Sequence, residues 1–279
     1  MSVKVVVDSG ADIPSELVTK HGIEIVPLKI RFGDREYVDT KDLTTDQFWE
    51  LCETSKELPQ TAAPSSGDFE TAFLKAKADG FDEVVCMTLS SDLSATFQAA
   101  TLAANNLQNE IKIELIDSRL ATFAIGSLAI ASSIEAVKGA SAEQISALVR
   151  SRIPFVHAFG ALDTLENLRK GGRIGKAAAL FGSLLSFKPI IDVRNGIIEG
   201  ESKQRTRGKA LNYLIEKTVS YGAITDLAII HANAPDVESF AEQLKTATGI
   251  QDLIVAKIGP VIGTHAGPRT MGVTFRTLG

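Results

Sequence analysis

Cysteine and histidine, which carry much metal-dependent and nucleophilic chemistry, are scarce in this chain. It has two cysteines, Cys52 and Cys86, and four histidines among 279 residues. No Cys/His or acidic cluster has the spacing of a metal site, so we expect no bound metal. Two such cysteines also make no disulfide framework, and free thiols in a reducing cytoplasm are the simpler expectation.

Long apolar runs and an excess of positive charge are absent as well. No run approaches the ~18 residues that a membrane span requires, and Ser2–Val7 is too short an apolar stretch for a signal peptide. Lys and Arg number 29 against 34 Asp and Glu, which gives a net charge of −5. A general nucleic-acid surface would need the opposite sign. These absences favour a cytoplasmic globular protein that does not bind nucleic acid.

Several common enzyme motifs are also missing. No Gly-x-Gly-x-x-Gly follows a predicted strand and no Gly-x-Ser-x-Gly elbow occurs, which weakens the dinucleotide-binding and esterase alternatives. The segment Arg173–Lys176 resembles a phosphate loop, but Ala177 occupies the Ser/Thr position of that motif. Its arginine, together with Arg205 and Arg207, is a candidate phosphate ligand. For the Arg205/Arg207 pair, composition alone slightly favours an exposed, solvated strand end.

The first half of the chain alternates strand and helix patterns. The apolar runs Val3–Val7, Phe81–Leu89 and Ile111–Ile116 are typical of parallel strands buried on both faces. With helical patterns between them, they predict an α/β domain with a doubly wound, mostly parallel sheet. Ile23–Phe32 is predicted to form one further strand. Asp12 is predicted to cap the helix that follows the first strand.

A second α/β domain is predicted to begin after Ile153-Pro154, which divides the chain into 1–153 and 154–279. Asn195-Gly196 is a strong hairpin signal, and the domain is expected to have a mixed sheet with helices. Two stretches, Ala121–Ala131 and Ala177–Phe187, are predicted helices that are apolar around most of their circumference. Such helices are either fully buried or line a cavity.

Hydroxyl-bearing turns recur where predicted strands or loops end. They are Asp8-Ser9, Thr61–Ser66 and Ser90–Thr96. Open α/β sheets place ligands at the carboxyl ends of their strands, and hydroxyls beside free N–H groups suit a carboxylate or phosphate. Each hydroxyl alone is more readily explained as a helix cap. Thr61 and Ser94 are harder to explain in this way, because neighbouring residues already supply the caps.

The segment Gly259–Gly272 holds four glycines around His265. By itself it predicts a turn-rich crossover between strands. A histidine held among glycines can also donate to an anion, or move a proton near neutral pH. The residues therefore leave three functions open: a binder with a buried chain and an anionic head group, a hydrolase or phosphotransferase that uses His265 with Ser94, and a binder of another anionic metabolite.

Taken together, these motifs resemble the DegV family, and the resemblance is colinear from residue 3 to the end of the chain. The matching segments are Asp8-Ser9 with Asp12-Ile13-Pro14, the Thr61–Ser65 loop, Ser90-Ser91-x-Leu93-Ser94-x-Thr96-x-Gln98, Asp117-Ser118, Leu165-x-x-Leu168-x-x-Gly171-Gly172-Arg173-Ile174, Lys188-Pro189-Ile190, Arg205-Thr206-Arg207 and Ile262-Gly263-Thr264-His265-x-Gly267-Pro268. Family members are bacterial fatty-acid-binding proteins, the FakB-type partners of a fatty acid kinase. The resemblance implies an acyl chain in a tunnel between two domains. It also implies a carboxylate that the separate kinase converts to an acyl phosphate for phospholipid synthesis.

The resemblance also implies roles for individual residues. Thr61, Ser94 and His265, with Thr264 and Ala95 beside them, would bind the carboxylate. Arg173 and Arg205 would contact the kinase or the transferred phosphoryl group. A long-chain fatty acid would be the ligand, with no cofactor, no catalytic residue and only transient membrane contact for lipid exchange. The sequence departs from the family pattern at three positions: Ala62 replaces a common serine, and Ala95 and Arg269 each replace a glycine.

Overall fold

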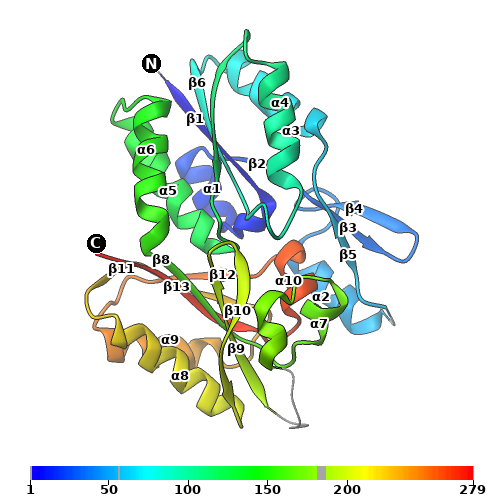
Figure 1. Ribbon diagram of the computed structural model, residues 1–279, viewed down its shortest axis with the longest axis vertical. Coiled ribbons are helices and arrows are strands. Elements are labelled where there is room, and N and C mark those ends of the chain that lie inside the picture. Colours follow the sequence, from blue (N-terminus) through cyan, green and yellow to red (C-terminus); the bar gives the residue numbers. More distant parts are fainter. Residues whose placement is uncertain (1, 56, 181–186, 279) are drawn as a thin grey trace.

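Two main β-sheets, one in each half of the molecule, organise the structure (Figure 1). The structure is a computed structural model and describes residues 2–55, 57–180 and 187–278. The sheet of the N-terminal half has four parallel strands in the order β2 (Glu24–Val26), β1 (Val3–Asp8), β6 (Glu83–Thr88) and β7 (Lys112–Asp117). The central strands β1 and β6 are buried along almost their whole length, which accounts for their continuous apolar sequence.

Helices cover both faces of this parallel sheet (Figure 1). They are α1 (Ser15–His21), α3 (Ser66–Ala78), α4 (Thr96–Asn106), α5 (Phe123–Val137) and α6 (Ala142–Arg152). On one face, Phe69 of α3 and Ala100 of α4 pack in a cluster with Val84 of β6. On the other, Phe123 of α5 shares a cluster with Val85. The prediction of a doubly wound α/β arrangement is confirmed.

The sheet of the C-terminal half is mixed, as predicted. Its strands lie in the order β10 (Ile197–Gln204), β9 (Lys188–Arg194), β8 (Val156–Ala161), β13 (Met271–Thr277), β11 (Ile224–His231) and β12 (Ile254–Lys257). The α-helices described in this half are α7 (Glu166–Lys170), α8 (Arg207–Ser220), α9 (Val237–Thr248) and α10 (Pro260–Ala266). Strands β11 and β12 run parallel, and the other neighbours are antiparallel. Because each sheet is built entirely from one side of the 153–154 boundary, we propose 1–153 and 154–279 as the two domains.

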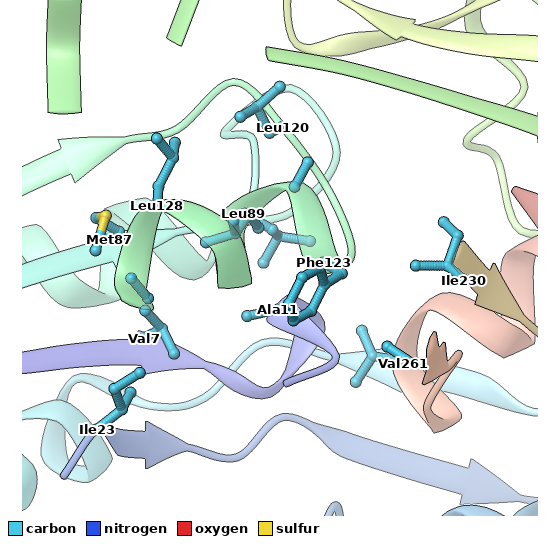
Figure 2. Packing of buried hydrophobic residues seen from close by; sticks show 14 of the residues in the cluster. Val7, Ala11, Ile23, Met87, Leu89, Leu120, Phe123, Leu128, Ile230 and Val261 are labelled. Atoms are coloured by element: carbon cyan, nitrogen blue, oxygen red, sulfur yellow. The ribbon is translucent and has the colours of Figure 1, made fainter. Parts of the chain in front are cut away.

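One hydrophobic cluster joins the two halves (Figure 2). Ile230 of β11 and Val261 of α10 belong to the same cluster as Val7 of β1 and Phe123 of α5. Side chains alternate across a strand, so Ile229 packs in the cluster beneath α8 and α9 while Ile230 faces the N-terminal half. The two halves therefore bury apolar faces against each other.

A small antiparallel sheet extends from the N-terminal half toward α10. Its strands are β4 (Arg35–Val38), β3 (Lys29–Phe32) and β5 (Gln60–Ala62), and α2 (Thr45–Thr54) lies between β4 and β5 in the chain. The prediction of a single strand over Ile23–Phe32 is wrong. Pro27, which has no N–H to donate to a ladder, interrupts it between β2 and β3. Consequently β2 pairs with β1, whereas β3 pairs with β4 and β5.

The segment Gly259–Gly272 connects β12 to β13, as the predicted crossover between strands requires, but it contains the helix α10 where turns are predicted. The helix begins with Pro260 at its first position, where the missing N–H has no helical partner to lose. Gly263 lies against the Trp49 ring, and a Cβ there would come within 2.7 Å of that ring. Helix α10 thus forms through close packing against α2, which periodicity in the sequence does not reveal.

Hydrogen bonds also connect the two halves. Asp12 accepts one from the Gly259 N–H of the other half (2.9 Å) and a second, within its own half, from the Thr122 hydroxyl (2.7 Å). The prediction that Asp12 caps α1 is therefore wrong, because its carboxyl group is directed toward the other half of the molecule. At a second contact, the Ser90 hydroxyl donates to the carbonyl of Gly196 at the tip of the β9–β10 hairpin (2.6 Å).

Two further observations concern the predicted helices. Gly175–Leu180 forms a 3-10 helix rather than the start of the α-helix predicted over Ala177–Phe187. The remainder of that prediction, residues 181–186, lies outside the described residues. Within the part of the chain that the structure describes, no helix combines the length and apolar character needed to cross a membrane.

Candidate ligand-binding site

An apolar cavity lies between the two halves of the molecule. Its volume of about 90 Å³ is several times the about 10–15 Å³ that a single water needs on the same measure. The N-terminal half contributes Leu28, Leu89, Leu93 and Ala121, and the C-terminal half contributes Ala158, Ile191, Ile198, Ile230 and Val261. Walls of this kind favour a hydrocarbon chain over water.

Four polar side chains singled out from the sequence line this same cavity: Thr61, Ser94, Arg173 and His265. They come from β5, from the loop between β6 and α4, from the segment after α7, and from α10. Thr61 Oγ1 lies 3.0 Å from His265 Nε2, and Ser94 Oγ lies 2.8 Å from Thr96 Oγ1. Hydroxyl, imidazole and guanidinium groups at one cavity suit an anionic oxygen group.

His265 is held neutral by its surroundings. Burial, and secondarily the nearby Arg173 cation, lower the pKa of His265 to about 4. Its Nδ1 atom is buried without a hydrogen-bond partner among the described residues. A histidine that acts as a general base usually has its second nitrogen oriented by a carboxylate or carbonyl. The surroundings of His265 favour hydrogen bonding over proton transfer.

Arg173 is fixed by the backbone rather than by an acidic side chain. Its Nε donates to the Leu93 carbonyl (3.0 Å) and its Nη1 to the Gly171 carbonyl (2.7 Å). No acidic side chain of the described residues forms an ion pair with it. Its positive charge therefore remains available to an anion in the cavity.

A second, polar cavity adjoins the apolar one at Thr61, Arg173 and His265. Its volume is about 340 Å³, and Gln60, Asn167, Lys170, Gly171 and Thr264 are among its other lining residues. The three shared side chains thus stand between an apolar interior and a polar outer space. This arrangement fits an amphiphilic ligand whose head group is reached from the outer side.

The remaining predicted site residues lie at different distances from this junction. Thr264 lines the outer cavity, but its hydroxyl donates to the Pro260 carbonyl within α10 (2.8 Å). Ala95 is exposed at the start of α4, and Arg205 is exposed just before α8. Neither of the two lines either cavity. The structure therefore brings together Thr61, Ser94, Arg173 and His265, and not Ala95 or Arg205.

Gly171 is a site residue that the sequence did not identify, because Gly171-Gly172 indicates only the end of a helix. A Cβ at Gly171 would overlap His265 Nδ1. Gly171→Ala is therefore expected to displace the imidazole and weaken ligand retention to a similar degree as loss of His265. Gly208→Ala is the matched control, since a Cβ there meets open space. Equal ligand content in the two purified variants, measured by native mass spectrometry, would contradict the expectation.

Two buried carboxyl groups beneath α10 predict an unusual pH dependence of stability. Burial raises the pKa of Asp8 to about 7 and that of Asp12 to about 8, from an ordinary value of 3.8. The folded protein therefore holds protons that the unfolded chain has released. From about pH 4 up to the folded-state pKa of each group, about 7 for Asp8 and about 8 for Asp12, the free energy of unfolding should fall as pH rises, by up to about 1.4 kcal/mol per pH unit for each group. Between pH 6.5 and 8 most of this slope comes from Asp12.

The lowered pKa of His265 acts in the opposite direction, but only between about pH 4 and 6.5. Asp12→Asn cannot titrate and should flatten the slope between pH 6.5 and 8. Urea unfolding at several pH values measures this slope. The same slope in the variant would show that Asp12 is already ionised in the folded protein.

A cavity between two α/β halves, with an apolar interior and a polar end, is typical of small-molecule-binding proteins. The chain belongs to the DegV family: the family model described as "Uncharacterised protein, DegV family" matches residues 2–278. A DegV domain-containing protein of Streptomyces coelicolor is 34% identical over 275 residues, which cover 97% of each chain. The family expected from the sequence motifs is thereby confirmed.

Solved structures of related proteins share the whole fold. A protein described as DegV, a fatty acid binding protein from Bacillus subtilis, is 30% identical with a TM-score of 0.87, and 100% of each chain is covered. A protein from Eubacterium ventriosum described as a stearic-acid-binding protein is 27% identical with a TM-score of 0.89. That match covers 99% of this chain and 98% of the other.

Proposed function

We propose that this protein binds a long-chain fatty acid between its two halves and presents the carboxylate to a separate fatty acid kinase. The observation that carries the proposal is the position of Thr61, Arg173 and His265, which line both the apolar and the polar cavity. The acyl chain occupies the apolar cavity, and the carboxylate lies at the junction. The fatty acids bound by the structural relatives from Bacillus and Eubacterium support the choice of ligand.

The energetics of this proposal are reasonable. Each buried CH₂ group of the ligand contributes about 0.8 kcal/mol. Transfer of a carboxylate out of water is costly unless hydrogen bonds replace its hydration. In the proposed complex, Thr61, Ser94 and His265 supply those hydrogen bonds, and Arg173 supplies positive charge. A dozen buried methylenes contribute about 10 kcal/mol, which can offset the cost of desolvating a carboxylate that gains these hydrogen bonds.

The kinase step requires no catalytic group from this chain. A carboxylate oxygen attacks the γ-phosphorus of a nucleoside triphosphate held by the kinase. An acyl–O–P bond forms, and the nucleoside diphosphate leaves with the electrons of the broken P–O bond. Arg173 faces the outer cavity, where it can contact the transferred phosphoryl group, and Arg205 lies on the exposed surface as a kinase contact. We further propose a cytoplasmic protein that needs no cofactor and meets membranes transiently for lipid exchange.

Ser94 and His265 give less support to a stand-alone hydrolase or phosphotransferase. His265 Nε2 is hydrogen-bonded to Thr61 rather than to Ser94, whose hydroxyl is bonded to Thr96. A histidine with a pKa near 4 is also a weak base at neutral pH. We therefore propose a binding protein rather than an enzyme.

Two experiments test the two parts of this proposal. Native mass spectrometry before and after solvent extraction should reveal a co-purified long-chain acid. The loaded protein, incubated with the fatty acid kinase of the same organism and ATP, should then form an acyl phosphate that hydroxylamine traps as a hydroxamate. A protein that neither retains nor takes up a fatty acid would contradict the binding function. A loaded protein that yields no hydroxamate with an active kinase would contradict the kinase partnership alone.

A further inference from the structure

Asp12 is a buried carboxyl group that lies outside both cavities of the proposed site. Only 8% of its surface is exposed, and no ion pair joins it to a cation of the described residues. The charged groups near it, Asp8 and Asp39, have its own sign. Burial of an uncompensated carboxyl group costs stability. Asp12 lines a third cavity, of about 640 Å³, and two hydrogen bonds join its carboxyl group to the rest of the fold.

The first hydrogen bond links Asp12 to the wall of the apolar cavity. Thr122, which lines that cavity, donates its hydroxyl to Asp12 Oδ2 at 2.7 Å. Thr122 has φ 56° and ψ −153°, a backbone conformation that is costly for a β-branched residue. It stands directly before α5 yet forms no side-chain cap to that helix. The Thr122 hydroxyl is therefore hydrogen-bonded to Asp12 rather than to the start of α5, although the backbone of Thr122 is strained.

The second hydrogen bond links Asp12 to the helix that carries the imidazole. The Gly259 N–H donates to Asp12 Oδ1 at 2.9 Å, directly before α10 begins at Pro260. A Cβ at Gly259 would come within 2.9 Å of the same oxygen, so a residue with a side chain at this position would crowd the Asp12 carboxyl group. His265 lies on this seven-residue helix. A shift at its beginning is transmitted to the ring, because so short a helix moves as a unit.

Other contacts of α10 also position it, including the hydrogen bond between His265 and Thr61 of β5 and the packing of Val261 with Leu89 and Phe123. The helix rests on Trp49 through Gly263, and Asn167 Nδ2 donates to the Thr264 carbonyl at 3.1 Å. These contacts hold the helix against α2 and α7. The contact through Asp12 is the one that joins it to Thr122 at the apolar cavity.

We propose that Asp12 is a positioning residue that sets the place of His265 in the carboxylate site by tying the start of α10 to Thr122 at the cavity wall. This inference rests on the proposed function, because it assumes that His265 holds the ligand's carboxylate. It assigns Asp12 no contact with the ligand. Its effect is therefore exerted through His265 and is confined to ligands that have an acidic head group.

The test compares hexadecanoic acid with hexadecan-1-ol, which has the same chain and no carboxylate. Dissociation constants are measured for the full-length wild-type protein and for Asp12→Ala and Asp12→Asn. Asp12→Ala should weaken binding of the acid about tenfold, as expected for loss of buried hydrogen bonds, and change binding of the alcohol less than about twofold. Asp12→Asn should restore acid binding, because its amide can accept from Gly259 and donate to the Thr122 hydroxyl.

A double-mutant cycle with His265→Ala distinguishes a positioning role of Asp12 from a purely structural one, because it measures whether the two substitutions affect acid binding independently. If Asp12 acts through His265, Asp12→Ala should have almost no further effect on acid binding once His265 is removed. Should Asp12→Ala fail to fold, Thr122→Val removes one of the two hydrogen bonds with little change of shape. Thr122→Ser should then restore acid binding.

Each outcome decides between the inference and its alternatives. Equal losses for acid and alcohol, or a loss that is additive with His265→Ala, would mean that Asp12 only stabilises the fold and would overturn the inference. Wild-type acid binding in Asp12→Ala would overturn it as well. If His265→Ala by itself leaves acid binding unchanged, this result contradicts the carboxylate site of the proposed function rather than the role of Asp12 alone. A loss with His265→Ala but none with Asp12→Ala leaves the proposed function intact.

Discussion

His265→Ala and Thr61→Ala are each expected to weaken binding of a long-chain fatty acid by roughly 10- to 100-fold. Each change removes a hydrogen bond to a charged oxygen at a site shielded from water, where such bonds contribute more than they do at the surface. The two side chains are 3.0 Å apart and line both cavities. Isothermal titration with the delipidated variants measures the effect directly.

The matched controls for these two variants carry the same residue types outside the cavities. These controls are His21→Ala and Thr19→Ala, and both residues lie in α1. His21 is hydrogen-bonded to the Ser133 hydroxyl, and the Thr19 hydroxyl donates to the Ser15 carbonyl. Both controls should bind the acid as the wild type does. If His265→Ala and Thr61→Ala also bind like the wild type, the carboxylate is held elsewhere and the assignment of the head-group site is wrong.

Ala158→Leu is expected to shorten the acyl chain that the protein accepts. Ala158 lies in β8 with 3% of its surface exposed and lines the apolar cavity. The three added carbons occupy space that two or three methylenes of the ligand would fill. At about 0.8 kcal/mol for each methylene, affinity for the longest acids should fall roughly 15- to 60-fold. Shorter acids should bind almost as well as they bind the wild type, and a chain-length series measures the difference.

The control for this substitution separates cavity filling from general overpacking. Ala103→Leu adds the same carbons to a fully buried alanine of α4, whose neighbours form the cluster on the other face of the N-terminal sheet. Overpacking costs both variants stability, typically ~1–3 kcal/mol. Only Ala158→Leu should change the preference for chain length. A uniform loss across all chain lengths in Ala158→Leu would place the acyl chain outside this cavity.

The sequence predicted best those parts of the fold whose signal is local. The sequence predicts Val3–Val7 and Phe81–Leu89 as buried parallel strands, because both faces of such strands are covered, which leaves a continuous apolar run. The prediction of one strand over Ile23–Phe32 is wrong because the apolar pattern continues through Pro27, whereas β2 and β3 belong to different sheets. Helix α10 was missed because a short helix rich in glycine, formed by packing on Trp49, has no periodicity to detect.

The sequence by itself determined the kind of chemistry available to this protein. Scarce cysteine and histidine, a net negative charge and recurrent hydroxyl-bearing turns pointed to an anion bound without a metal. Thr61, Ser94, Arg173 and His265 were all identified from residue type and motif, since these are properties of the residues themselves. The family motifs extended this to a fatty acid, as a resemblance.

Only the tertiary structure decided which of these residues meet. It placed Thr61 beside His265 although 204 residues separate them, and left Ala95 and Arg205 on the surface. It also showed that Asp12, which the sequence predicts as a helix cap, connects Thr122 to the start of α10 through two hydrogen bonds. The physical reason is that a shared site depends on how two sheets pack against each other. That packing is set by many buried contacts at long sequence separation, which no local pattern records.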